Sequence, residues 1–265
     1  MPPSKPIPSS TVIIARNSQT EDSIEIFMVV RHHQIDFASG ALVFPGGKVS
    51  NSDTDPELRN YCSGAESWSN EALVLGLAAI RESFEECGIL LACSQDKTEL
   101  ISNHRLNTLQ HYRRALEKGD LSMLEFAQKE KLTFTLKHLH HFAHWITPEA
   151  MPKRFDTHFY LTQAPVDQIG CHDGSESVDS LWISPQQALN SADKGELKII
   201  FPTRMNLIRL AQFTNLEEAI KGCCNQSVVT VMPWTEQRDT ESVLCIPTDA
   251  GYTITELPLE LVMRS

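Results

Sequence analysis

Three glutamates close together in one predicted helix are the residues of this sequence best suited to chemistry. Glu82, Glu85 and Glu86 stand at positions i, i+3 and i+4 of the segment RESFEECG, so their carboxylates project from one helix face. Such closely spaced negative charges repel one another unless a cation compensates them. Oxygen ligands suit hard divalent cations, so the segment predicts a site for Mg²⁺ or Mn²⁺. For an arbitrary ExxEE pattern, a solvated acidic helix face is the alternative.

The elements that must position these carboxylates are a helix and the strands before it. The helix is predicted to begin near Asn70, a suitable N-cap, and to end at Gly88, a suitable C-terminal cap. Upstream, residues 11–15 and 25–30 are β-rich runs separated by a polar turn. A third apolar run, residues 41–44, stops at the turn Pro-Gly-Gly.

The rest of the chain alternates helical and strand signals. A helical pair is predicted over residues 104–130, divided at Gly119-Asp120. The later predicted strands are LHHFAHWI, RFDTHFYLTQ, SVDSLWIS, VVTVMPW, SVLCIP and GYTIT, and the later predicted helices are PQQALNSAD and residues 203–221. These elements predict an α/β fold with one extended sheet.

The glycine turn and the glutamate helix together resemble the Nudix box, G-x5-E-x7-R-E-U-x-E-E-x-G-U. The positions that match it are Arg81, Glu82, Glu85, Glu86, Gly88 and Ile89, while Ser83 occupies a slot that is usually hydrophobic. Counting back from Arg81 places Leu73 where the box has its isolated glutamate. Gly47 and Arg81 are 34 positions apart, which indicates an insertion at about residues 50–69.

The resemblance implies a Nudix α/β/α sandwich with a mixed β-sheet, plus a C-terminal α/β appendage. It implies a Nudix domain over residues 8–200 and an appendage over residues 201–265 packed on the same domain. The implied metal ligands are Gly46, through its carbonyl group, Glu82, Glu85 and Glu86, and Arg81 is expected to orient the carboxylates. The general base is Glu82 or the loop residue Glu176, for which Asp173 and Asp179 are rivals.

A second resemblance concerns the substrate. RHHQIDFASGALVFPGG is similar to the coenzyme A diphosphatase pattern R-[SA]-x3-R-x3-G-x3-F-P-G-G at Arg31, Gly40 and the stretch 44–47, with His32 and Asp36 departing from it. A box with an insertion beside VFPGG also resembles the acyl-CoA diphosphatase branch. These likenesses imply cleavage of coenzyme A or acyl-CoA into 3′,5′-ADP and 4′-phosphopantetheine products.

Three residues are predicted to bind the substrate, and other functions stay open. The predicted contacts are Arg31, Gly47 and Arg154, whose guanidinium could instead pair with Asp156 or another acid. A nucleotide sugar, ADP-ribose or a dinucleotide is the alternative substrate. An inactive Nudix module that only binds a ligand is the alternative of another class.

Composition limits the partners. Lysine and arginine number 23 against 34 aspartates and glutamates, a net charge of −11, which disfavours a nucleic acid polymer as partner. No apolar run reaches the length of a membrane span, there is no apolar signal core, and the C-terminal MRS is not an SKL address, so we expect a cytoplasmic protein. The seven cysteines are scattered along the chain, which is typical of reduced thiols. The histidines of residues 138–145 are not predicted to bind metal. Whether the protein forms a homodimer stays open.

Overall fold

A mixed β-sheet forms the centre of the protein. The computed structural model describes residues 3–32, 39–172, 174, 177–238 and 241–263. Within these ranges eight strands form the sheet, with the order β10-β2-β1-β9-β8-β11, and with β3 on β2 and β4 on β1. The strands are β1 (Ile7–Asn17), β2 (Ile24–Arg31), β3 (Leu42–Val43), β4 (Gly46–Lys48), β8 (His140–Ile146), β9 (Phe155–Gln163), β10 (Ser177–Ile183) and β11 (Thr230–Val231).

The central sheet is buried on both faces, because successive side chains of β1 point alternately to one face and to the other. β1 runs parallel to β9, with Ile7 opposite Phe155, and antiparallel to β2. Val12 and Ile14 belong to the apolar core on one face, whereas Ile13 and Ala15 belong to the core on the other. Because successive side chains of a strand point to opposite faces, one strand supplies both cores.

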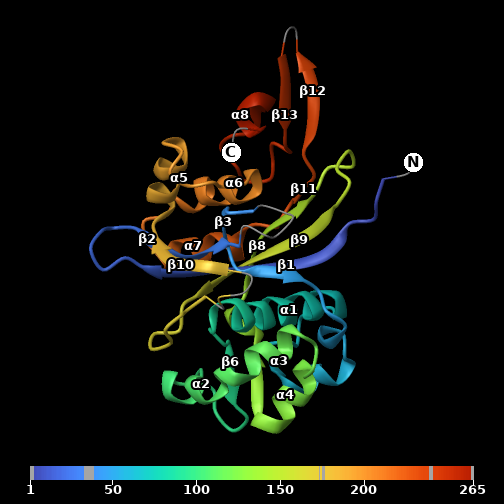
Figure 1. Cartoon of the computed structure of the whole chain (residues 1–265), viewed down its shortest axis with the longest axis vertical. Coiled ribbons are helices and arrows are strands. Elements are labelled where there is room, and N and C mark those ends of the chain that lie inside the picture. The colour runs from blue at the N-terminus through green and yellow to red at the C-terminus, as the bar shows by residue number, and fades with distance from the viewer. Residues whose placement is uncertain (1–2, 33–38, 173, 175–176, 239–240, 264–265) are drawn as a thin grey trace.

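The glutamate helix covers one face of the sheet. α1 (Asn70–Cys87) begins after Ser69, whose hydroxyl accepts a hydrogen bond from the Ala72 amide, so Ser69 rather than Asn70 is the N-cap. It ends at Gly88, which has a φ of 65°, a left-handed conformation that favours glycine. Below α1 lie α2 (Asn103–Leu109), α3 (Arg113–Glu117) and α4 (Met123–Glu130), with a small sheet of β5 (Cys62–Ser63), β7 (Leu132–Thr135) and β6 (Ala92–Ser94) (Figure 1).

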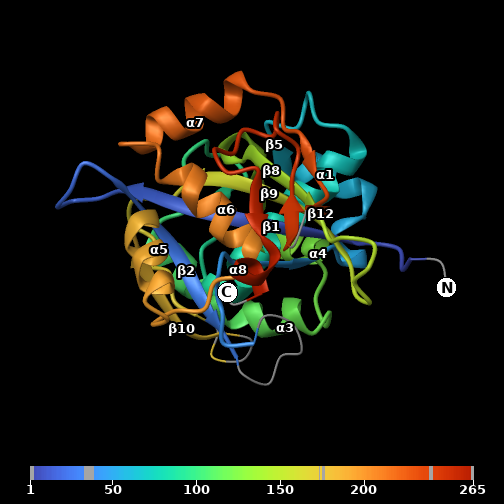
Figure 2. The ribbon, with the colours of Figure 1, turned by 90° about the horizontal axis from the view of Figure 1, so that it is seen from above.

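Helices from the second half of the chain cover the other face. α5 (Pro185–Asp193), α6 (Phe201–Leu210) and α7 (Leu216–Asn225) lie on the side opposite α1 (Figures 1 and 2). The indole of Trp145 donates to the hydroxyl of Tyr252 at 2.8 Å, and this hydroxyl bonds Asn206 at 2.7 Å. These buried hydrogen bonds join the sheet to the C-terminal segments.

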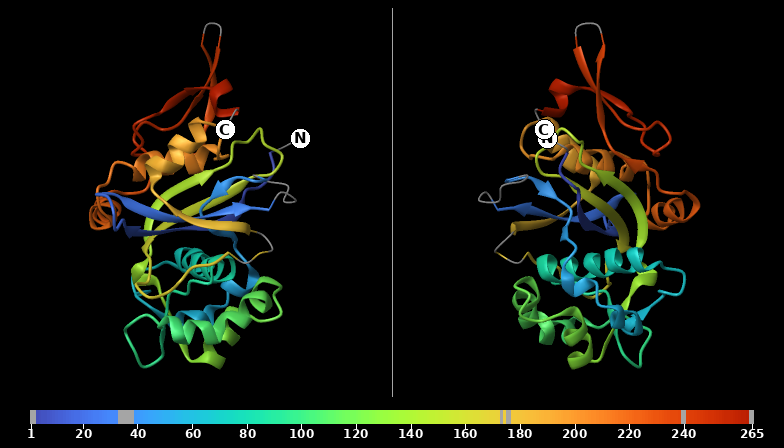
Figure 3. Two further views of the ribbon diagram at one scale, coloured as in Figure 1. Left: turned by 60° about the vertical axis from the view of Figure 1, so that its left-hand side comes forward. Right: turned by 90° about the vertical axis from the view of Figure 1, so that its right-hand side faces the viewer.

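A three-stranded sheet projects beyond these helices. It consists of β12 (Trp234–Arg238), β13 (Glu241–Cys245) and β14 (Glu256–Pro258), and α8 (Leu259–Met263) lies beside it (Figure 3). β14 comes later than the predicted strand GYTIT, which forms no strand here. No helix among the described residues is both long and apolar enough to cross a membrane.

Candidate active site

Arg81 is the centre of a buried network of carboxylates. Its Nη1 donates to Glu82 Oε1 at 2.9 Å and to Glu85 Oε2 at 2.8 Å. Its Nε and Nη2 donate to the two oxygens of Asp53 at 2.9 and 3.0 Å, and Nη2 also donates to the Lys48 carbonyl at 2.8 Å. Burial favours a lower pKa for Arg81, but Glu82, Asp53 and Glu85 outweigh it and raise the pKa, so the guanidinium stays charged. Arg81 therefore contacts three carboxylates at once, and its role in orienting them during catalysis stays a prediction.

Asp53 has the position that sequence counting gave to Leu73. Leu73 is a buried apolar residue of the core under α1, so it has no part in the polar network. Asp53 follows Gly47 by six positions, the spacing of the first half of the box, and it lies in the short 3₁₀ helix Asn51–Asp53. The insertion therefore begins after Asp53, not at residue 50. Counting forward from Gly47 would have revealed this residue.

Glu85 has a carboxylate oxygen that suits a cation. Its Oε1 is buried and has no hydrogen-bond partner among the described residues, whereas Oε2 accepts from Arg81. Burial raises the pKa of Glu85 to about 8, with Arg81 opposing the shift. A buried oxygen without a partner costs free energy, and a divalent cation bound here would compensate it. The residues therefore fit the predicted metal site.

The glycine turn lies directly against the glutamates. The Gly46 amide donates to Glu86 Oε2 at 2.9 Å, which fixes the turn to α1. A Cβ on Gly47 would lie 2.5 Å from Glu82 Oε1, so glycine is required for the carboxylate to occupy this position. The role of the Gly46 carbonyl as a metal ligand stays a prediction.

The C-terminal end of α1 is held by polar contacts that the sequence did not reveal. The Ser83 hydroxyl, in the slot that is usually hydrophobic, donates to the Ile89 carbonyl at 2.9 Å. Arg113 of α3 donates through Nε and Nη2 to the Glu85 carbonyl at 3.0 and 2.9 Å. These contacts provide donors for carbonyl groups at the end of the helix, and they fix the position of the α1 backbone that carries the glutamates.

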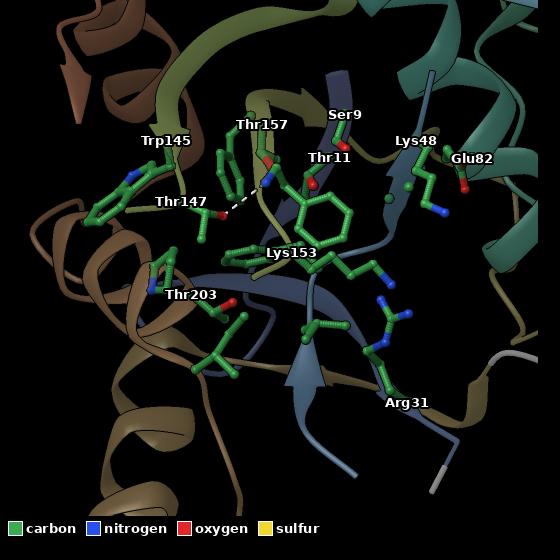
Figure 4. A pocket seen from close by; sticks show the side chains of 18 of the residues that line it. Ser9, Thr11, Arg31, Lys48, Glu82, Trp145, Thr147, Lys153, Thr157 and Thr203 are labelled. Atoms are coloured by element: carbon green, nitrogen blue, oxygen red, sulfur yellow. Dashed lines mark hydrogen bonds between the residues drawn. The ribbon is translucent and has the colours of Figure 1, made fainter. Parts of the chain in front are cut away.

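A pocket of about 1160 Å³ opens from the glutamates. Arg31, Lys48 and Lys153 line it, and their charged ends point toward the same region, beside Glu82 (Figure 4). The Nε of Arg31 is buried and has no hydrogen-bond partner among the described residues. The pocket thus joins a carboxylate cluster to a group of cations, an arrangement suited to a diphosphate that bridges a metal ion and basic side chains.

Beyond the cations, the wall of the pocket is mostly apolar, with a few threonines among its residues. Its aromatic residues are Trp145, Phe155 and Phe159 on β8 and β9, together with Phe44 and Phe201. Pro233, Leu244, Leu259 and Val262, all from the C-terminal segments, also line the pocket. Residues 201–265 thus help to enclose the same pocket as the glutamates.

The prediction for Arg154 is wrong. Its side chain is buried and donates to the carbonyls of Thr147 at 2.9 Å and Ser4 at 2.8 Å, so it holds the chain around the β8–β9 turn. It does not line the pocket, and neither does it pair with Asp156. The neighbouring residue Lys153 points into the pocket instead.

Two of the four candidates for the general base, Asp179 and Glu82, belong to the described residues. Glu176 and Asp173 lie outside the described residues, as does Asp36 of the substrate pattern. Asp179 is exposed on β10 and does not line the pocket. Glu82 lines the pocket and is buried.

This sheet between two helical layers, with a glutamate helix against a glycine turn, is the arrangement of a metal-dependent hydrolase of the Nudix class. A family model described as the NUDT19 Nudix domain matches residues 63–210. The chain belongs to this Nudix hydrolase family, whose members act on diphosphate bonds and generally need divalent metals.

Individual relatives agree with this family. The chain is 24% identical over 258 residues to the acyl-coenzyme A diphosphatase NUDT19 of Xenopus laevis, covering 82% of this chain and 68% of the relative. It is 25% identical over 256 residues to the NUDT19 of Gallus gallus, covering 75% and 66%. The chain thus spans about two thirds of the length of these relatives. A Nudix hydrolase from Alicyclobacillus acidocaldarius has a TM-score of 0.67 at 24% identity, over 82% of this chain and 96% of that one, and shows the same fold.

Proposed function

We propose that the protein hydrolyses the diphosphate of coenzyme A or an acyl-CoA, giving 3′,5′-ADP and a 4′-phosphopantetheine product. The observation that carries the proposal is a single pocket with the buried glutamates at one end, three cations beside them and an apolar wall beyond. Coenzyme A offers the matching groups, a diphosphate, a 3′-phosphate and a long pantetheine arm. Relatives named acyl-coenzyme A diphosphatase support the same substrate class.

The glutamates would hold Mg²⁺, or Mn²⁺ in its place. Carboxylate ligands favour hard cations of this kind, and Glu85 and Glu86 with the turn at Gly46 provide them. When bound, the metal polarises the diphosphate and lowers the pKa of a water ligand. Arg81 keeps Glu82 and Glu85 in position during the reaction.

Glu82 is the proposed general base. It lines the pocket and accepts a hydrogen bond from Arg81, which holds its carboxylate in position. Comparing Glu82→Gln with Glu176→Gln in kcat across pH tests this assignment. Full activity of Glu176→Gln beside an inactive Glu82→Gln supports Glu82, and the opposite pattern transfers the role to Glu176.

Arg31 and Lys153 are the proposed contacts of the substrate phosphates. The overall charge of −11 gives no general attraction for a polyanion, so these local cations must select it. A charge-assisted contact contributes about 1.5–3 kcal/mol, roughly ten- to hundredfold in binding.

A substrate panel tests the function directly. Coenzyme A, an acyl-CoA, dephospho-CoA, NADH, ADP-ribose and a nucleotide sugar are compared by kcat/KM with Mg²⁺ or Mn²⁺. Arg31→Ala is expected to raise KM for coenzyme A by about ten- to hundredfold and that for dephospho-CoA, which lacks the 3′-phosphate, far less. Arg114→Ala, an exposed arginine outside the pocket, is the matched control. A preference for ADP-ribose, NADH or a nucleotide sugar over both CoA forms would contradict the substrate proposal.

A further inference from the structure

A second group of metal-ligating side chains lies on the opposite face of β8 and β9 from the pocket. Phe155, Thr157 and Phe159 line the pocket, so the residues between them on β9, Asp156 and His158, point to the other face. His144 of β8 is paired with His158 across the strands. This group is therefore separate from the glutamate site.

The three side chains bring their ligand atoms together. One ligand atom each of His144, Asp156 and His158 lies within 4.8 Å of the other two. His144 Nε2 is 2.5 Å from Asp156 Oδ1, and His158 Nε2 is 3.9 Å from the same oxygen. In a tetrahedral zinc site with metal–ligand distances of about 2.0–2.1 Å, two ligand atoms lie about 3.3 Å apart, a value between these two N···O distances. Rotation of the imidazole rings about χ2, a soft torsion, would make the two distances equal.

Each imidazole also has a partner for its second nitrogen. His144 Nδ1 is 2.8 Å from the Thr230 hydroxyl, and His158 Nδ1 is 3.0 Å from His141 Nε2. Histidines that bind metal typically use one ring nitrogen for the ion and donate the other N–H to a neighbouring acceptor. Here the Nε2 atoms of both rings face the carboxylate, while both Nδ1 atoms face such neighbours.

The group is partly open to solvent. The side chains of His144, Asp156 and His158 are 15%, 35% and 20% exposed, so an ion can reach them from solvent. Neutral imidazole and carboxylate ligands favour a transition metal over Mg²⁺.

We infer that His144, Asp156 and His158 form a binding site for Zn²⁺ or a similar divalent transition metal, distinct from the catalytic site. The ion would join β8 to β9. Thr230 of β11, which bonds His144, would support the site from the C-terminal part of the chain. The role is structural, because the group faces away from the pocket.

Binding of Co²⁺ and Zn²⁺ to the full chain tests this site. In saturating Mg²⁺, Co²⁺ is titrated while visible absorption is recorded, since tetrahedral Co²⁺ with nitrogen ligands absorbs much more strongly than octahedral Co²⁺ held by oxygens alone. We expect one equivalent with the intense spectrum. Zn²⁺ should displace it, and at a hundredfold excess over Kd should raise Tm by roughly 5–10 °C.

Variants separate this site from the glutamate site. His158→Gln should remove the intense Co²⁺ spectrum and the Zn²⁺ shift in Tm while keeping Mg²⁺-dependent activity. Thr230→Val should keep the spectrum but weaken metal affinity by about 10–100-fold, as expected for a supporting residue. His104→Gln, in which an exposed histidine of α2 is changed, is the matched control.

Two results would overturn the inference. The first is a wild-type protein with no intense Co²⁺ spectrum and no Zn²⁺-dependent rise in Tm, which would leave only a hydrogen-bonded histidine cluster. The second is an unchanged spectrum in His158→Gln and in His144→Ala, which would place the ion elsewhere. Either result leaves the proposed diphosphatase activity untouched.

Discussion

Replacing Asp53 by asparagine tests whether this residue completes the glutamate network. Asp53→Asn keeps the shape of the side chain but removes its charge and turns an amide group toward the Arg81 guanidinium. The Asp53 carboxylate accepts hydrogen bonds from Arg81 at 2.9 and 3.0 Å and from the Ser50 amide at 2.8 Å, and the side chains of Arg81 and Asp53 are only 6% and 0% exposed. Breaking a buried pair of this kind costs about 3–5 kcal/mol.

The same change should reach the metal site. With Asp53 neutral, Glu82 and Glu85 are the charged partners that Arg81 keeps among the described residues, so its charge draws these two carboxylates more strongly toward it. We therefore expect a higher Mg²⁺ concentration for half-maximal activity together with a lower kcat.

The assay combines urea unfolding with activity at varied Mg²⁺. The free energy of unfolding should fall by about 3–5 kcal/mol, a decrease in Tm of roughly 10 °C. Asp120→Asn, in which an exposed aspartate outside the network is changed, is the control. A loss below about 1 kcal/mol, the value of an exposed ion pair, with unchanged dependence on Mg²⁺ would refute the reasoning.

Other predictions follow from the same site. Glu86→Gln should lower kcat by about 10²–10³-fold or more with little change in the urea midpoint, and normal turnover at saturating Mg²⁺ would contradict its role. Gly47→Ala places a methyl group 2.5 Å from the observed position of Glu82 Oε1, so kcat should fall about 10²-fold, whereas wild-type kcat would show that the turn adapts. In EDTA, the free energy of unfolding should fall as the pH rises from about 4.5, the ordinary pKa of Glu85, toward 8. The reason is that Glu85 keeps its proton to a higher pH in the folded protein than in the unfolded chain. Urea midpoints at pH 5 and pH 8 measure this slope, which should be smaller in Glu85→Gln and in Mg²⁺.

Sequence reasoning found the elements of the fold and most of the glutamate site because both depend on local spacing. The alternation of β1 and the cap at Gly88 are readable within a few residues. The general base, the substrate and the division at residue 200 stay predictions.

Asp53 and Lys153 were missed because their roles depend on three-dimensional context. When a segment is inserted within the box, the isolated acidic position can be counted either forward from Gly47 or back from Arg81, and the two counts give different residues. Only the contact between Arg81 and Asp53 shows which count is right. Alternation places Lys153 on the same side as Phe155, but the sequence does not say which side of the strand faces the pocket. The fork of donors on its guanidinium favours Arg154 in the sequence.

The histidine group depends on an irregular strand. Strict alternation puts His141 and His144 on opposite faces of β8. A register shift between His141 and Ala143 adds one residue, so His141 faces Tyr160 while His144 faces His158. The two histidine rings therefore approach the same partner, His158, a result that a regular strand pattern excludes.

The pocket is assembled from residues that are far apart in the sequence, from Ser9 to Val262. During translation, which adds about 5–20 residues per second, the glutamate helix leaves the ribosome long before α8 does. A nascent chain can therefore fold its carboxylate site while the pocket still lacks the apolar wall supplied by Leu244 and Leu259. A substrate that relies on this wall can therefore bind only after the residues up to Leu259 have been synthesised and folded.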